Sequence, residues 1–128
     1  MLLSLLLMLA ASDGPMAAEP AAPHPPMLAY PDRPLVYFSD YPAAALSEGR
    51  SGTAIAELTI SNRGDVESCA IIRSSGHRDL DNLTCRALAI RATFIPARGP
   101  DGRRITARVN QPVRWDAAAI LAARAQGS

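Results

Sequence analysis

Apolar and polar residues alternate strictly in two parts of the chain. The segment TAIAELTIS places one set of apolar side chains on a single face, namely Ala54, Ala56, Leu58 and Ile60. The segment RRITARVNQPVRW does the same with Ile105, Ala107, Val109, Val113 and Trp115. A period of two predicts a strand with one buried face. Pro112 cannot donate a ladder hydrogen bond, so the second strand is expected at a sheet edge.

A third strand is expected between these two segments in the sequence. Asn62 and Gly64 are typical of a tight turn, and VESCAIIRS follows as the return strand of a hairpin. Beyond this hairpin the apolar period becomes helical. One stripe contains Leu80, Leu83, Ala87, Leu88 and Phe94. Asp79 is the expected N-cap of this helix, and Pro96 is expected to stop it.

Two shorter helices complete the expected elements. Pro42 suits a first helical turn and Gly49 an end, which predicts a short helix over residues 42–48. The segment DAAAILAARAQGS predicts a helical tail over 116–128. Helices packed on a three-stranded sheet give an α+β fold, for which one small core suffices.

The N-terminal third of the chain has a different composition. Residues 1–12 are mostly apolar and are followed by small residues, a layout typical of a secretory signal peptide. We assign residues 1–18 to a signal peptide, cut after Ser12 or alternatively after Ala18, or to the remnant of a membrane anchor if the true start lies upstream. Seven prolines between Pro15 and Pro34 predict an extended conformation there without helix or sheet, and we assign residues 19–40 to a proline-rich linker.

Charge and motif content exclude several classes of function. The 13 basic residues are all arginines and are interspersed with 12 acidic ones, so the chain is not expected to bind nucleic acid. The sequence contains no glycine-rich phosphate loop and no catalytic triad motif. We therefore expect no enzyme activity, no cofactor and no metal, which leaves a binding module.

The two cysteines, Cys69 and Cys85, allow three interpretations. Fifteen intervening residues are too many for a redox Cys-x-x-Cys pair. A zinc site with His77 would lack an evident fourth ligand. A disulfide from the second strand to the following helix is favoured, since export would permit it and a small core would benefit from it.

Several short motifs together resemble the C-terminal domain of the TonB family. They lie between residues 41 and 115 and comprise Tyr41-Pro42 with Ala45, Gly52, Asn62 to Val66, Ser74-Ser75-Gly76, Leu80-Asp81, and Phe94 with Pro96-Ala97. The resemblance implies a three-stranded antiparallel sheet with helices on one face, located in the periplasm. It also implies binding to N-terminal segments of outer-membrane TonB-dependent receptors, which import siderophores, cobalamin and similar nutrients. An inner-membrane proton-driven motor and a second copy of the chain are further candidate partners.

The last strand is the expected binding surface, because an edge strand offers unpaired backbone groups to an extended peptide. The expected partner-binding residues are Thr106, Ala107, Arg108, Val109, Asn110, Gln111 and Val113 on this edge, with Tyr41 and Pro42 nearby. Tyr41 could instead be a half-buried aromatic that anchors the fold. Arg104, Arg108 and Arg114 could either steer a partner or keep the edge soluble. The alternative function is an envelope structural or assembly module of the same fold without a transport role.

Overall fold

A computed structural model describes residues 15–20 and 22–127. Most of the expected signal peptide, including the cleavage point after Ser12, lies outside the described residues. Within them, no helix is both long enough and apolar enough to cross a membrane.

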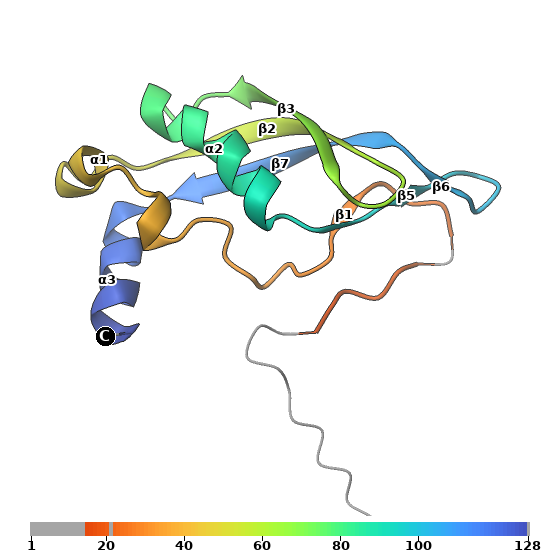
Figure 1. Ribbon diagram of the computed structural model, residues 1–128, viewed down its shortest axis with the longest axis horizontal. Coiled ribbons are helices and arrows are strands. Elements are labelled where there is room, and N and C mark those ends of the chain that lie inside the picture. Colours follow the sequence, from red (N-terminus) through yellow and green to blue (C-terminus); the bar gives the residue numbers. More distant parts are fainter. Residues whose placement is uncertain (1–14, 21, 128) are drawn as a thin grey trace, which may run out of the picture.

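The centre of the molecule is a three-stranded antiparallel sheet (Figure 1). Its strands are β2 (Gly52–Ile60), β3 (Val66–Arg73) and β7 (Ala107–Trp115), in the order β3-β2-β7. The α+β fold expected from the sequence is therefore confirmed. The strand that carries Pro112 lies at an edge, as its missing N–H predicts.

The alternation in β2 buries one face of the strand, as predicted. The four apolar residues of its inner face are completely buried: Ala54, Ala56, Leu58 and Ile60. The turn to β3 is closed by hydrogen bonds from Ser61 N–H to Asp65 O and from Gly64 N–H to Ser61 O. Gly64 has a φ of +89°, which an L side chain rarely adopts. Its carbonyl also accepts a hydrogen bond from Phe94 N–H, so this turn is packed against another part of the chain.

Helix α2 (Arg78–Arg91) lies across one face of the sheet and buries Leu80, Thr84, Ala87 and Leu88 (Figure 1). The expected N-cap Asp79 is wrong, because His77 occupies that position. The acidic residue that organises this turn is Asp81, whose carboxylate accepts hydrogen bonds from Ser74 and Ser75.

The end of α2 also differs from the expectation. The helix stops at Arg91, five residues before Pro96, and Phe94 belongs to strand β4 (Phe94–Ile95). Strand β4 pairs with β1 (Met27–Leu28) from the proline-rich segment. The backbone after Arg91 is thus used for a long-range pairing that a helical period cannot reveal.

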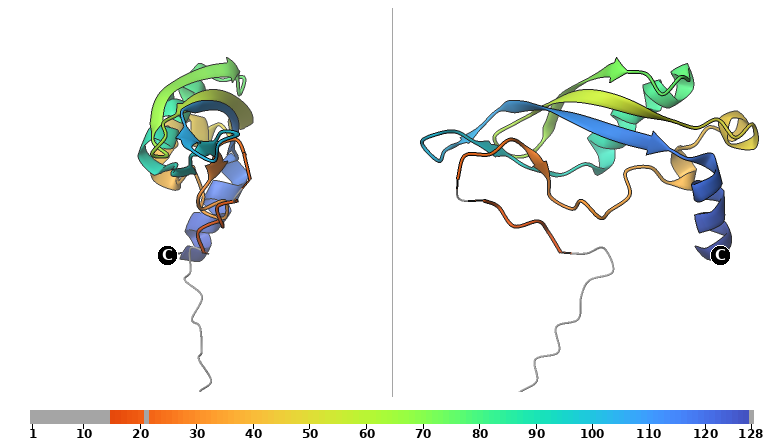
Figure 2. Two further views of the ribbon diagram at one scale, coloured as in Figure 1. Left: turned by 90° about the vertical axis from the view of Figure 1, so that its right-hand side faces the viewer. Right: turned by 180° about the vertical axis from the view of Figure 1, so that it is seen from behind.

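The proline-rich segment docks on the domain, and the expectation of no sheet between Pro15 and Pro34 is wrong, because β1 lies there. It contains β1 and the 3₁₀ helix η1 (Phe38–Asp40), and it runs beside the sheet (Figures 1 and 2). His24 forms an isolated bridge with Arg98. Ala29 is completely buried and Val36 is 8% exposed. Short apolar stretches between the prolines dock on the domain and account for this difference.

The last strand is shorter than expected at its start. Arg104 and Ile105 form a separate strand, β6 (Arg104–Ile105), which pairs with β5 (Ala97–Arg98). Ile105 is 42% exposed and does not join the core, and Thr106 lies between β6 and β7. A local hairpin through Gly102, whose φ is +78°, takes up these residues.

Two helices lie at the end of the sheet away from the β5–β6 hairpin (Figure 1). Helix α1 (Ala43–Ser47) agrees with the expected short helix to within a residue at each end. Helix α3 (Ala117–Gly127) continues from the end of β7 and projects away from the sheet (Figure 2). The helical tail is thus present.

Cys69 and Cys85 form a disulfide with an S–S distance of 2.07 Å and a Cα–Cα distance of 5.7 Å. The favoured interpretation of the cysteines is confirmed. The bond connects edge strand β3 to α2, so it fixes the helix on the sheet.

Candidate partner-binding edge

One long side of β7 is open. Its inner side pairs with β2 in an unbroken register from Gly52–Trp115 to Ile60–Ala107. Within residues 15–20 and 22–127, its outer side makes no backbone hydrogen bond to any other segment. A nine-residue strand whose outer side is unpaired is a template to which an extended peptide can add.

Pro112 indicates which residues face this open side. It lies opposite Ile55 of β2 and has no N–H, so its position suits a residue whose backbone groups point outward. Its carbonyl accepts a hydrogen bond from the Gln111 side-chain amide at 2.9 Å in an exposed location. By the same alternation we infer that Arg108, Asn110 and Arg114 turn their N–H and C=O groups to the open side.

The side chains of β7 fix the strand in place. Val113 and Trp115 are buried in the core, whereas Arg108, Asn110 and Arg114 are exposed on the opposite face. The indole N–H of Trp115 donates to Thr84 Oγ1 of α2 at 2.8 Å. The inner face is therefore anchored by side chains, and this anchoring uses no backbone group of the outer edge.

The two arginines of β7 form only exposed ion pairs. Arg108 Nη1 lies 3.8 Å from Glu57 Oε1, and Arg114 Nη2 lies 3.0 Å from Asp116 Oδ2. The arginine side chains are 75% and 77% exposed, so these pairs contribute little to stability. Both roles considered for these arginines, steering and solubility, stay compatible with this geometry.

The sheet has a second edge, formed by β3, which is a poorer template. The pairing of β2 with β3 shifts register between Ile55 and Ala56 and again between Thr59 and Ile60. Such irregularities bend and twist a strand away from flat pairing. The regular register of β7 makes it the better candidate for strand addition.

A groove borders the open edge of β7. It has a volume of roughly 300 Å³. One wall is the C-terminal half of β7, from Gln111 to Arg114, and the other is the proline-rich segment, through Leu28, Pro31, Arg33, Pro34, Leu35 and Val36. The sequence analysis missed this second wall. Its only signal was the apolar pair Leu35-Val36 between the prolines and η1.

The structure brings together most of the expected partner-binding residues but not all. Ala107, Arg108, Val109, Asn110, Gln111 and Val113 lie in β7. Thr106 precedes the strand. Tyr41 is only 6% exposed, since its ring packs edge-on against Trp115 at 5.3 Å and its hydroxyl donates to Arg50 O. Pro42 is the N-cap residue of α1, and neither Tyr41 nor Pro42 belongs to β7.

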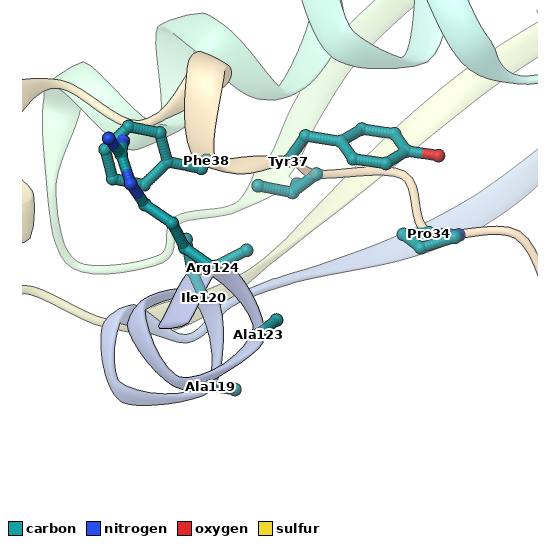
Figure 3. A pocket seen from close by; sticks show the side chains of 8 residues that line it. Pro34, Tyr37, Phe38, Ala119, Ile120, Ala123 and Arg124 are labelled. Atoms are coloured by element: carbon teal, nitrogen blue, oxygen red, sulfur yellow. The ribbon is translucent and has the colours of Figure 1, made fainter. Parts of the chain in front are cut away.

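A second, apolar pocket lies between η1 and α3 and shares Pro34 and Val36 with the groove (Figure 3). It has a volume of roughly 600 Å³, and its lining includes Pro34, Tyr37, Phe38 and Ile120. The guanidinium of Arg124 lies 3.8 Å from the centre of the Phe38 ring, a cation–π contact that ties α3 to η1.

The described part of the chain holds no cluster of three or more residues suited to binding a metal ion. Comparison with curated proteins gave no match. A sequence model of the family described as Gram-negative bacterial TonB protein C-terminal matches residues 39–117. This range covers most of η1, the whole three-stranded sheet and the first residue of α3. The chain belongs to the TonB C-terminal domain family, whose members interact with outer-membrane receptors.

Proposed function

We propose that this protein binds an extended N-terminal segment of an outer-membrane TonB-dependent receptor as a fourth strand on β7. The binding takes place in the periplasm and supports energy-dependent import of siderophores or similar nutrients. Family membership supports a receptor-interacting, transport-associated role in the cell envelope. The residues that carry the interaction are those of the open edge from Arg108 to Arg114.

The open outer side of β7 is the observation that carries this proposal. Arg108, Asn110 and Arg114 would each exchange two backbone hydrogen bonds with the peptide, and Pro112 would accept one. Such bonds contribute about 1 kcal/mol each, and ordering the peptide offsets part of the gain. Seven such bonds would give about 7 kcal/mol, so after this offset we expect weak, reversible binding with a Kd above roughly 10 μM.

A pair of substitutions at Asn110 tests the role of the backbone. The chain and its variants are titrated with synthetic peptides that match the N-terminal segments of receptors, and binding is measured by calorimetry. Asn110→Pro removes one outward N–H and should weaken binding about tenfold or more, because a bond is lost and the peptide clashes with the ring. Asn110→Ala keeps the backbone and should bind like the wild type. Equal affinities for both variants would contradict strand addition at this edge.

Export is the second part of the proposal. The backbone N–H of Ala17 donates to Ala29 O at 2.7 Å, and Glu19 forms ion pairs with Arg98 and Arg104. Cleavage after Ser12 would preserve these contacts, whereas cleavage after Ala18 would remove the first. We therefore favour Ser12. The intact mass of the protein recovered from cells decides between the two sites and an uncleaved anchor.

The transport role needs a test in cells, because a structural or assembly module could use the same edge. A deletion strain should grow more slowly than its parent when iron is limiting, and the wild-type gene should restore growth. Growth equal to that of the parent would favour the structural alternative. Coupling to an inner-membrane motor and self-association are tested separately, by cross-linking in cells and by sedimentation of the purified protein.

A further inference from the structure

The proline-rich segment is fixed to the domain on both sides of the β7 groove. Upstream, Met27 and Leu28 pair with β4, and Ala29 N–H donates to Thr93 O at 2.8 Å. Downstream, Val36 is buried in the core and Leu35 O accepts a hydrogen bond from Arg91 Nη1 at 3.4 Å. The residues in between must therefore cross the space beside β7.

These intervening residues form an exposed arch, here defined as residues 31–34. All four are exposed, in contrast to the buried Ala29 and Val36 on either side. The arch begins with a turn in which Arg33 N–H donates to Tyr30 O at 3.1 Å. No backbone hydrogen bond joins the arch to β7 among the described residues. Pro31 and Pro34 have no N–H, so the arch cannot complete a fourth strand itself.

The arch borders only half of the open edge. It lines the groove together with Gln111, Pro112, Val113 and Arg114. Residues 107–110, in the first half of β7, do not line that groove. A peptide that adds along the whole edge would have to enter the space beside Arg114 that the arch borders, whereas Arg108 and Asn110 are reached without passing it.

We propose that the arch is a movable guard over the C-terminal half of the β7 edge. This inference rests on the proposed strand addition. A peptide pairs first with Arg108 and Asn110, and it pairs with Arg114 only after the arch has moved aside. The ends of the segment stay docked while this happens, because their hydrogen bonds and buried side chains lie outside the arch. The guard also shields part of the edge from pairing with the wrong strands.

Glycine substitutions in the arch test the guard. Pro31→Gly with Pro34→Gly frees the backbone of the arch while its length is kept. The matched control is Pro23→Gly with Pro25→Gly, which changes two exposed prolines of the same segment that do not line the groove. All measurements use the full chain, and a cooperative thermal transition above the temperature of measurement verifies that each variant is folded.

Two readouts are taken with the receptor-derived peptides: affinity by calorimetry, and amide hydrogen exchange by NMR. In the wild type and in the control, the peptide should slow exchange at Arg108 and Asn110 more than at Arg114. In the arch variant, Arg114 should gain comparable protection and affinity should rise about threefold to tenfold, since a larger fraction of molecules is competent for full pairing.

The outcomes separate the guard from the function on which it rests. If Arg114 is protected as strongly as Arg108 in the wild type, or if the arch variant binds no more tightly than the control, the guard is wrong and strand addition stands. If no peptide slows exchange at any of the three amides, strand addition itself is wrong. The proposed role of the arch is then wrong as well, because it depends on strand addition.

Discussion

The indole N–H of Trp115 donates a hydrogen bond to the hydroxyl of Thr84 at 2.8 Å, and both side chains are completely buried. Thr84 in turn donates to Leu80 O at 2.8 Å. This chain of two bonds connects the end of β7 to α2 through the core. It holds the inner face of β7 against the helix, and neither bond uses a backbone group on the outer edge of the strand.

Thr84→Val should destabilise the protein by about 1–3 kcal/mol, because it leaves the indole N–H buried without an acceptor. Thr84→Ser keeps the hydroxyl and should lose only about 1 kcal/mol for the missing methyl group. Urea denaturation followed by the fluorescence of Trp115, the one tryptophan in the chain, measures both. A valine variant as stable as the serine variant would show that this bond contributes little.

Removal of the disulfide should be costly for so small a core. The double variant Cys69→Ser with Cys85→Ser should lose about 3 kcal/mol of stability, since a loop of fifteen residues is no longer closed in the unfolded chain. Thermal unfolding with and without reductant checks this. Reductant should lower the melting temperature of the wild type to that of the variant and leave the variant unchanged. Equal melting temperatures throughout would contradict a stabilising role.

Asp81 makes stability depend on pH. Burial raises the pKa of its carboxyl, but hydrogen bonds from the Ser74 and Ser75 hydroxyls and from Ser75 N–H outweigh this and hold the pKa below its ordinary value. A lowered pKa in the folded state means that the carboxylate stabilises the protein at neutral pH and loses this effect as pH falls through that pKa. Asp81→Asn should therefore be less stable than wild type at pH 7.

The difference between Asp81→Asn and the wild type should begin to shrink below about pH 4, where the unfolded chain takes up a proton, and should disappear only below the lowered pKa of the folded state. The control is Asp65→Asn, at an exposed aspartate of the β2–β3 turn. Its difference from the wild type should stay small at every pH. Urea denaturation from pH 7 down to pH 3 measures both. A difference for Asp81→Asn that does not change with pH would contradict the assigned cause.

Glycine can be required by a positive φ or by a close contact with another segment, and a comparison of Gly64 with Gly49 distinguishes the two. Both have positive φ, +89° and +68°, but a Cβ added at Gly64 would lie 2.1 Å from Phe94 O, whereas one added at Gly49 would meet nothing within 4 Å. Gly49→Ala should cost about 1–2 kcal/mol through the backbone conformation alone. Gly64→Ala should cost more, because the β2–β3 turn must move away from β4. Equal losses in thermal unfolding would show that the turn adapts freely.

The sequence by itself determined the elements whose signal is local. Alternation over nine residues gave β2 its buried face, Pro112 placed β7 at an edge, and the stripe from Leu80 to Leu88 gave α2. The spacing of the two cysteines, read with these elements, indicated the disulfide. Each inference works because side-chain direction repeats with the period of the element and because proline lacks an N–H.

Only the tertiary structure decided which distant segments pair with each other through their backbones. Met27 pairs with Ile95, so α2 ends early and the proline-rich segment docks beside the sheet instead of acting as a free spacer. The same docking forms the second wall of the β7 groove, and Tyr41 turns into the core against Trp115. The physical reason is that periodicity reports which face of a segment is apolar, whereas its pairing partner depends on a segment far away in the chain.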